Sequence, residues 1–226
     1  MRELIDLLSG FVSWARRKRR IRVPPGVVKV NVGSGMKVVP GWIHVDGSLN
    51  ALCSNWPAAV LKLLYRLTNV KQWYTEEEYL QILKHHRFIH HDVSYGLPFV
   101  DESVDYLYSS HLLEHLSAAK AQHLLGDAFR VLKPGGQVRI CVPDLEYAID
   151  LYQKGEKHNA LDILYPSHAG RQSLHQFMYD FELLRAALTK AGFHSIERCG
   201  YRQGRTPDID KLDNRPEQTL YVEAVK

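Results

Sequence analysis

The sequence predicts an α/β protein: a doubly wound, mainly parallel seven-stranded sheet with helices on both faces and an antiparallel strand pair at its C-terminal end. Two observations support this prediction. Short apolar, β-branched runs alternate with stretches of helical periodicity, which is typical of a parallel sheet covered by helices. The last two apolar runs have no convincing helix between them, which indicates an antiparallel pair at the edge of the sheet.

The expected strands lie at 27–32, 42–45, 88–91, 104–109 and 138–142, and then within "HSIERCGYRQG" and "QTLYVEAVK". A chain of 226 residues can hold one domain of this kind with an inserted lobe, but hardly two full domains. We therefore expect a leader over 1–26 and a single domain over 27–226.

The leader is basic and amphipathic. Apolar residues recur at helical spacing in "MRELIDLLSGFVSWARRKRR", and seven basic but only two acidic residues lie within 1–22. Such a helix can contact an anionic membrane or a protein, or dock on its own domain. The rest of the chain is close to neutral, so no nucleic-acid partner is expected.

The composition indicates a soluble chain. The hydrophobic share is 45% and the charged share 24%, and no apolar run is long enough to span a bilayer. Glu3 and Asp6 stand where a secretory signal would be basic, so a cytoplasmic location is expected. Three scattered cysteines suggest neither a disulfide framework nor a thiolate metal site.

Two segments are longer than the fold requires. The first, about 50–86, is rich in Leu, Tyr and Trp and predicts a helical insert of two helices; the second, about 152–180, is polar and contains histidine. Segments between the strand ends of an open α/β sheet often cover the ligand crevice. Both are therefore candidates for the walls of a substrate site.

A glycine turn follows the first expected strand in "VNVGSGMKVVPGWIHVD". Gly33 and Gly35 allow a sharp turn and a close approach of the backbone to a ligand. A dinucleotide fingerprint would need a third glycine at position 38 and an acid about 20 residues after the first glycine. Here position 38 is Val and Asp46 comes early, so a ribose is favoured over a pyrophosphate.

Several ordered motifs extend this interpretation: "NVGSG", "GWIHVD", "GLPFVDESVDYLYSSHLLEHL" and "LKPGGQVRICVPDLE". With them, the chain over about 27–226 resembles the class I S-adenosylmethionine-dependent methyltransferases. The resemblance is strongest to a small group that often accompanies polysaccharide biosynthesis. It implies S-adenosyl-L-methionine as the cofactor.

The resemblance also implies roles for individual residues. Gly33, Ser34 and Gly35 would pass under the methionine part and the ribose, and Asp46 would bind the ribose hydroxyls. The adenine side would be formed by Asp92 with Val93, and Ser110 would lie at the strand end that borders the methyl group. Many members carry an acid where this chain has Asn31, which could accept a hydrogen bond from the cofactor's amino group only as a neutral acceptor.

Histidines are the candidate bases, because a hydroxyl acceptor must lose its proton near pH 7. His111 is the first choice, since it ends the fourth expected strand. Glu114 and His115 follow at the start of the next helix, and His175 belongs to the covering segment. The spacing of the first three matches a zinc-peptidase pattern, but that pattern needs both histidines on one helix. Some relatives hold a divalent metal at this strand end, and imidazole with carboxylate would suit one.

The resulting prediction is a methyltransferase that O-methylates a saccharide or another small hydroxyl acceptor. One alternative is a nicotinamide oxidoreductase on the same fold, which the glycine spacing and the lack of a Tyr-x-x-x-Lys pair disfavour. The other is a non-catalytic cofactor-binding protein recruited through its leader. A homodimer, a metal and the partner of the leader are left open.

Overall fold

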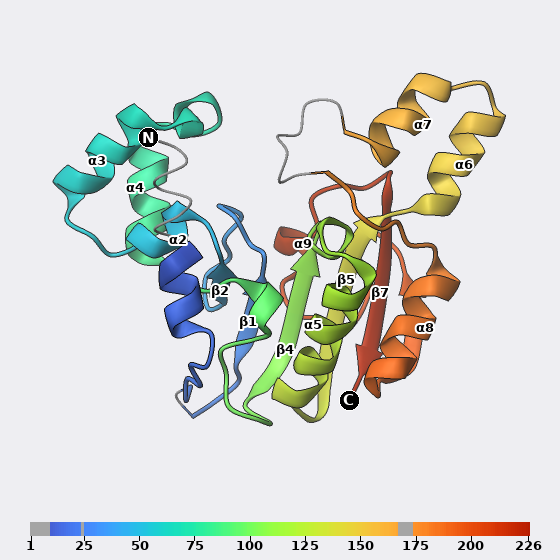
Figure 1. Ribbon diagram of the computed structural model, residues 1–226, viewed down its shortest axis with the longest axis horizontal. Helices are drawn as coiled ribbons and strands as arrows, with labels where there is room; N and C mark the ends of the chain where they lie inside the picture. Colours follow the sequence, from blue (N-terminus) through green and yellow to red (C-terminus); the bar gives the residue numbers. More distant parts are fainter. Residues whose placement is uncertain (1–9, 24, 167–173) are drawn as a thin grey trace.

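The computed structural model describes residues 10–23, 25–166 and 174–226. The predicted leader before Gly10 and part of the predicted covering segment, 167–173, lie outside these residues. A single sheet runs through the domain in the order β3-β2-β1-β4-β5-β7-β6 (Figure 1). Its strands are β1 (Lys29–Val32), β2 (Ile43–Asp46), β3 (Arg87–His90), β4 (Val104–Ser110), β5 (Leu132–Pro143), β6 (His194–Cys199) and β7 (Thr219–Val225).

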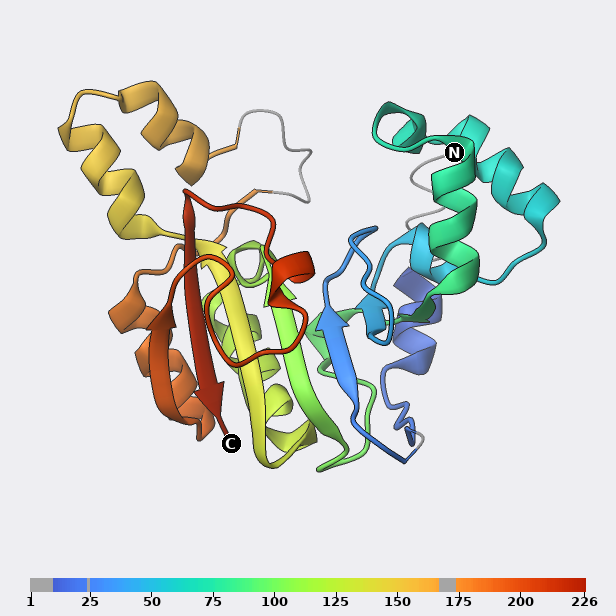
Figure 2. The same cartoon turned by 180° about the vertical axis from the view of Figure 1, so that it is seen from behind.

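All neighbouring strands pair in parallel except β7, which is antiparallel to both β5 and β6. The long helices α5 (Ala118–Val131) and α8 (Phe181–Ala191) cover one face, over the main hydrophobic core. On the other face, a smaller cluster joins Trp42, Tyr108 and Tyr221 to Leu212 of the short helix α9 (Ile209–Leu212) (Figure 2). The predicted doubly wound sheet with its antiparallel C-terminal pair is confirmed.

The insert between β2 and β3 contains more helices than predicted: α2 (Leu49–Cys53), α3 (Ala58–Leu67), the 3-10 turn η1 (Asn69–Gln72) and α4 (Glu76–His85). Two local signals divide it. Pro57 stands immediately before α3, and Thr75 starts α4 with a capping box shared with Glu78. The insert has its own core around Leu61 and Tyr79.

A second helical pair follows β5, with α6 (Leu145–Gln153) and α7 (Lys157–Leu164) packed on each other through Ala148, Leu151, Ala160 and Ile163. Both helical lobes rise beyond the edge of the sheet where β4 and β5 end (Figure 1). The fold therefore places them where they can border a ligand held at the strand ends.

The described part of the leader forms a helix over 10–16. Phe11 and Trp14 on it are 64% and 50% exposed. Beyond it, the Ile21 N–H donates to the Pro98 carbonyl at 2.8 Å, so the chain joins the domain before residue 27. Contact of this helix with a membrane or a protein stays a prediction; among the described helices none is long and apolar enough to cross a bilayer.

Candidate active site

Strand register brings the functional segments together at the C-terminal ends of the parallel strands. Val32 pairs with Ser109 and Ser110 with Cys141. Because β7 runs antiparallel, it begins beside these same strand ends, where Thr219 pairs with Pro143. The turn after β1, the residues after β4 and the loop before β7 therefore lie together.

The glycine turn has the backbone that its sequence predicts. Gly33 and Gly35 have φ angles of +69° and +52°, a region that favours glycine. A Cβ at Gly33 would lie 2.9 Å from the methyl carbons of Leu112, whereas a Cβ at Gly35 would meet nothing within 4 Å. Gly35 faces a cavity, so the bare backbone leaves space for a ligand there.

Asp46 fixes this turn. Its Oδ2 accepts a hydrogen bond from the Gly35 N–H at 2.8 Å, and its Oδ1 accepts one from the Ser48 N–H at 2.8 Å. Each carboxylate oxygen can accept a further hydrogen bond, so the ribose hydroxyls of the cofactor could still be bound. The residues at this turn thus fit the cofactor that the sequence predicts.

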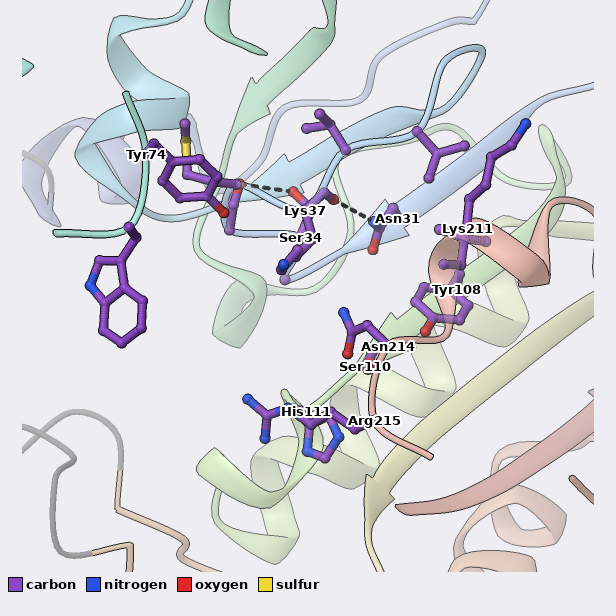
Figure 3. Close-up of a pocket in the computed structure, with 17 residues that line it drawn as sticks. Asn31, Ser34, Lys37, Tyr74, Tyr108, Ser110, His111, Lys211, Asn214 and Arg215 are labelled. Carbon is purple, nitrogen blue, oxygen red and sulfur yellow. Dashed lines mark hydrogen bonds between the residues drawn. The ribbon is translucent and has the colours of Figure 1, made fainter. Parts of the chain in front are cut away.

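Asn31 is 3% exposed, and its Nδ2 donates to the Lys37 carbonyl at 3.2 Å (Figure 3). That bond ties the loop after the glycine turn to β1. The amide nitrogen keeps a second N–H, and the side-chain oxygen can act toward a ligand as a neutral acceptor.

A cavity of about 580 Å³ opens at this turn. The glycine turn and the residues after β4 form part of its wall, and the insert and the loop before β7 form other parts (Figure 3). Its lining includes Asn31, Gly33, Ser34, Gly35, Lys37, Trp73, Tyr74, Tyr108, Ser110, His111, Lys211, Asn214 and Arg215.

Three predicted cofactor residues are not part of this cavity wall: Asp46, which lies behind the glycine turn, and Asp92 and Val93. Asp92 caps the 3-10 turn η2 (Val93–Tyr95) by accepting from the Ser94 N–H at 2.9 Å. Val93 is 8% exposed and packs in the main core. Both follow β3, whose neighbour His91 donates its N–H to the Asp46 carbonyl at 3.1 Å. Their adenine contact stays a prediction.

His111 has a backbone that aims its ring at the strand ends. It follows β4 with a φ angle of +50°, which is uncommon for a residue with a side chain and is often found at functional sites. Its N–H donates to the Cys141 carbonyl at 2.8 Å. Its Nδ1 lies 3.2 Å from Glu114 Oε1, and its Nε2 lies 3.1 Å from the Thr219 hydroxyl oxygen.

Glu114 is the most unusual group of the site. It lies in the 3-10 turn η3 (Leu113–His115) and is 1% exposed, yet neither carboxylate oxygen has a hydrogen-bond partner among the residues that the structure describes. Three imidazoles surround it: His115 Nε2 is 3.9 Å from Oε1, and the His115 and His175 rings are 5.1 Å apart. A buried carboxylate without a partner is costly.

The segment that carries His175 is attached to this turn, because the Gln176 N–H donates to the Glu114 carbonyl at 2.7 Å. Burial lowers the pKa of His175 below its ordinary value, although the Glu114 charge acts in the opposite direction. All four predicted catalytic residues therefore lie together, and they border a second cavity of about 400 Å³.

Glu114, His115 and His175 also fit a metal in their chemistry. One ligand atom from each lies within 4.8 Å of the others, and two imidazoles with a carboxylate suit several divalent metals. A metal here stays a prediction. The zinc-peptidase pattern does not form, because His111 follows a strand while Glu114 and His115 lie on the next turn.

Sequence reasoning missed several residues of the site: Tyr108, Lys211, Asn214 and Arg215, which line the cavities, and Thr219, which contacts His111. The last four precede or begin β7. Their position could have been predicted from the sequence. An antiparallel last strand begins beside the C-terminal ends of the parallel strands, so the residues that precede it lie at the site. The short stretch before "QTLYVEAVK" could therefore have been placed at the site.

Part of the chain matches a family of known proteins. Residues 49–140 match the family described as a methyltransferase domain. A demethylmenaquinone methyltransferase of Clavibacter sepedonicus is 31% identical over 126 residues, which are 52% of this chain and 50% of that protein. This chain thus spans about half the length of the curated relative that it matches.

Solved structures extend the likeness to the whole domain. A candidate O-methyltransferase of Nostoc punctiforme has a TM-score of 0.51 at 13% identity, over 99% of this chain and 56% of that one. The S-adenosylmethionine-dependent methyltransferase SibL has a TM-score of 0.50 at 18% identity, over 88% of this chain and 50% of that one. At these identities the likeness concerns the fold.

Proposed function

We propose that this chain, a member of the class I S-adenosylmethionine-dependent methyltransferases, transfers the cofactor's methyl group to a hydroxyl oxygen of a saccharide or another small acceptor. One observation carries the proposal. The glycine turn pinned by Asp46 and the histidine at the end of β4 open onto the same cavity. A cofactor held at the turn would therefore present its methyl group near His111.

The cofactor side would be held by the backbone of the glycine turn, by Asp46 at the ribose and by Asn31 near the methionine part. When bound, the cofactor supplies a methyl group on a sulfonium, which is already a good leaving group. The protein then has mainly to orient the two reactants and to exclude water. Trp73 and Tyr74 of the insert, which line the cavity, would take part in that exclusion.

The acceptor's proton would pass to His111 Nε2. In the free protein this nitrogen faces the Thr219 hydroxyl, so the acceptor hydroxyl would replace that contact. Nδ1, which lies 3.2 Å from Glu114 Oε1, would carry the other ring hydrogen, and the buried carboxylate would stabilise the imidazolium that forms. This assigns a role to a carboxylate that otherwise has no hydrogen-bond partner.

His115 and His175 lie close to Glu114, and both border the second cavity with His111. We assign them to the acceptor side, where they can donate to or accept from hydroxyl groups. A sugar presents several hydroxyls at once, and each of the three imidazoles can donate to or accept from one of them. This arrangement supports a polyhydroxylated acceptor over an apolar one.

The test is transfer of a labelled methyl group from S-adenosylmethionine to extract fractions that contain saccharides, with quinols as a separate fraction. We expect label in a saccharide, and we expect His111→Ala to lower kcat by about 100-fold while the Kd for S-adenosylhomocysteine stays within about twofold. His123→Ala is the matched control, because His123 is exposed on α5.

Other outcomes separate the rival functions. Label in the quinol fraction alone would indicate that the acceptor is a quinone-type compound and not a saccharide, as the name of the curated relative suggests. Binding of NAD in place of S-adenosylhomocysteine would favour an oxidoreductase. Cofactor binding without transfer to any fraction would favour a binding protein without catalysis.

A further inference from the structure

The loop between α9 and β7 connects the two cavities. Arg215 and His111 are the two residues that line both of them within the described chain. The arginine therefore stands at the junction between the cofactor side and the acceptor side, next to the proposed base (Figure 3). Nothing in the methyl-transfer chemistry described above uses it.

The fold anchors this loop on both sides of Asn214. Asp213 is buried and accepts two hydrogen bonds from the guanidinium of buried Arg139, at 2.6 and 3.1 Å. It also accepts one from the Arg202 N–H at 2.8 Å. On the other side, the Tyr221 hydroxyl donates to the Arg215 carbonyl. The backbone of Arg215 is thus held in place from within the core.

The side chain of Arg215 is not used by this anchoring. It is exposed, and its guanidinium takes part in no hydrogen bond or ion pair in the part of the chain that the structure describes. Lys29 on the same side of the sheet is different, because its Nζ lies 2.6 Å from Asp208 Oδ2. An arginine on a firmly held backbone with a free guanidinium is suited to bind a ligand.

The larger cavity has an excess of positive charge. Lys37, Lys211 and Arg215 line it, and its lining includes no Asp or Glu. Asp208 already pairs with Lys29, which lowers the pKa of the Asp208 carboxyl, and the charge of Lys211 helps to lower it. These two lysines thus share one carboxylate, which leaves one positive charge uncompensated between them. Cavity walls with one sign of charge attract ligands of the opposite sign.

The cofactor cannot account for this excess. S-adenosylmethionine carries a sulfonium, an ammonium and one carboxylate, so its own net charge is positive. Lys37, which follows the glycine turn, can pair with that carboxylate. The exposed cations Arg215 and Lys211 are then available to a second anion, and the acceptor is the other molecule that enters the cavity.

We infer that the acceptor carries a carboxylate or a phosphate, and that Arg215 binds this group and thereby positions the acceptor hydroxyl at His111. The inference rests on the proposed function, whose acceptor it specifies. Guanidinium binds both kinds of oxyanion through two parallel hydrogen bonds. An acidic sugar and a sugar phosphate are the two forms of acceptor that fit a hydroxyl-bearing ligand of this charge.

The test is a chemical-shift titration of the ¹⁵N-labelled protein saturated with S-adenosylhomocysteine. The probes are D-glucuronate, D-glucose 6-phosphate and neutral D-glucose. We expect at least one anionic probe to bind about tenfold or more tightly than glucose, with shifts at the Arg215 Nε–H. Comparison of the two anions identifies whether carboxylate or phosphate is preferred.

Variants assign the effect to the residue. Arg215→Gln should lower the affinity for the preferred anion about tenfold or more, and Arg215→Lys should lower this affinity less. Arg66→Gln, which removes the same charge from an exposed position on α3, should leave the affinity unchanged.

Three results would overturn the inference: equal binding of glucose and the anions, no anion binding in the millimolar range, or the same loss in Arg66→Gln as in Arg215→Gln. These results would leave the proposed function standing if S-adenosylhomocysteine still binds. If the protein fails to bind S-adenosylhomocysteine, that result would instead contradict the proposed function itself.

Discussion

Gly33 shows how one residue without a side chain shapes the site. Its φ of +69° and the nearby Leu112 methyl carbons leave no space for a Cβ, and its N–H donates to the Val45 carbonyl at 2.8 Å. The turn therefore depends on glycine for both conformation and packing. Asp46 then holds the turn at Gly35 from the end of β2.

Gly33→Ala should lower the free energy of unfolding by about 1–3 kcal/mol, because the substitution adds backbone strain and a clash with Leu112. Gly126→Ala is the matched control. Gly126 lies inside α5, and a Cβ there would meet nothing within 4 Å, so we expect a gain of about 0.5–1 kcal/mol. Urea denaturation measures both, and a loss of equal size in the two variants would contradict this account.

At the scale of elements, the loop before β7 depends on a buried ionic network. Arg139 has no exposed side-chain surface and pairs with both Asp213 and Glu223. Removing one partner of a buried pair leaves a charge without compensation, which is strongly destabilising. The same network holds the backbone that presents Arg215.

Asp213→Asn should therefore cost about 3–5 kcal/mol of unfolding free energy. The control is Asp150→Asn on α6, where the Lys154–Asp150 pair is exposed on both sides, so its loss should stay below about 1 kcal/mol. Thermal and denaturant unfolding of the two variants provide the measurement. Equal small losses would show that the network does not anchor the loop.

The β2 strand gives the protein a pH-dependent stability. His44 is fully buried, with Nε2 3.3 Å from the Val39 carbonyl oxygen, and packs against Phe88. Burial lowers its pKa from 6.5 to about 4, with smaller effects from Val39 and His86. The unfolded chain therefore binds more protons than the folded one between these two pH values.

Unfolding free energy should accordingly be highest above pH 6.5 and fall as the pH is lowered toward 4, with His44 contributing about 3 kcal/mol to the decrease. Burial lowers the pKa of His90 and His91 in the same direction. His44→Gln should show a shallower decrease when unfolding is measured across this range. An unchanged slope would mean that other groups control the acid sensitivity.

At the scale of the whole molecule, sequence patterns were sufficient for the sheet, and they also picked out four residues that the structure brings together. The predicted strand at 104–109 is β4, and the last two runs form the antiparallel pair. Strong β-branched runs and glycine turns are local sequence patterns, so they can be recognised without knowledge of the tertiary structure. The four predicted catalytic residues come together because three of them follow one strand and the fourth is hydrogen-bonded back to that turn.

The remainder depended on contacts between distant segments. The insert contains α2, α3 and α4 where two helices were predicted, because Pro57 and the Thr75 capping box divide a continuous apolar pattern. The direction of the last strand could have placed Arg215 near the site, but not its anchored backbone, which follows from the burial of Asp213 against Arg139, 74 residues earlier. Ionic contacts of this kind leave no periodicity in the sequence.

The central claim is that the Asp46-pinned turn binds the cofactor while His111 acts only on the acceptor. Calorimetric titration with S-adenosylhomocysteine tests it most directly, on the wild-type protein, Asp46→Ala and His111→Ala. We predict saturable binding to the wild type, a loss of about tenfold or more for Asp46→Ala, and nearly unchanged affinity for His111→Ala. Undiminished binding to Asp46→Ala, or equal losses in both variants, would contradict the account.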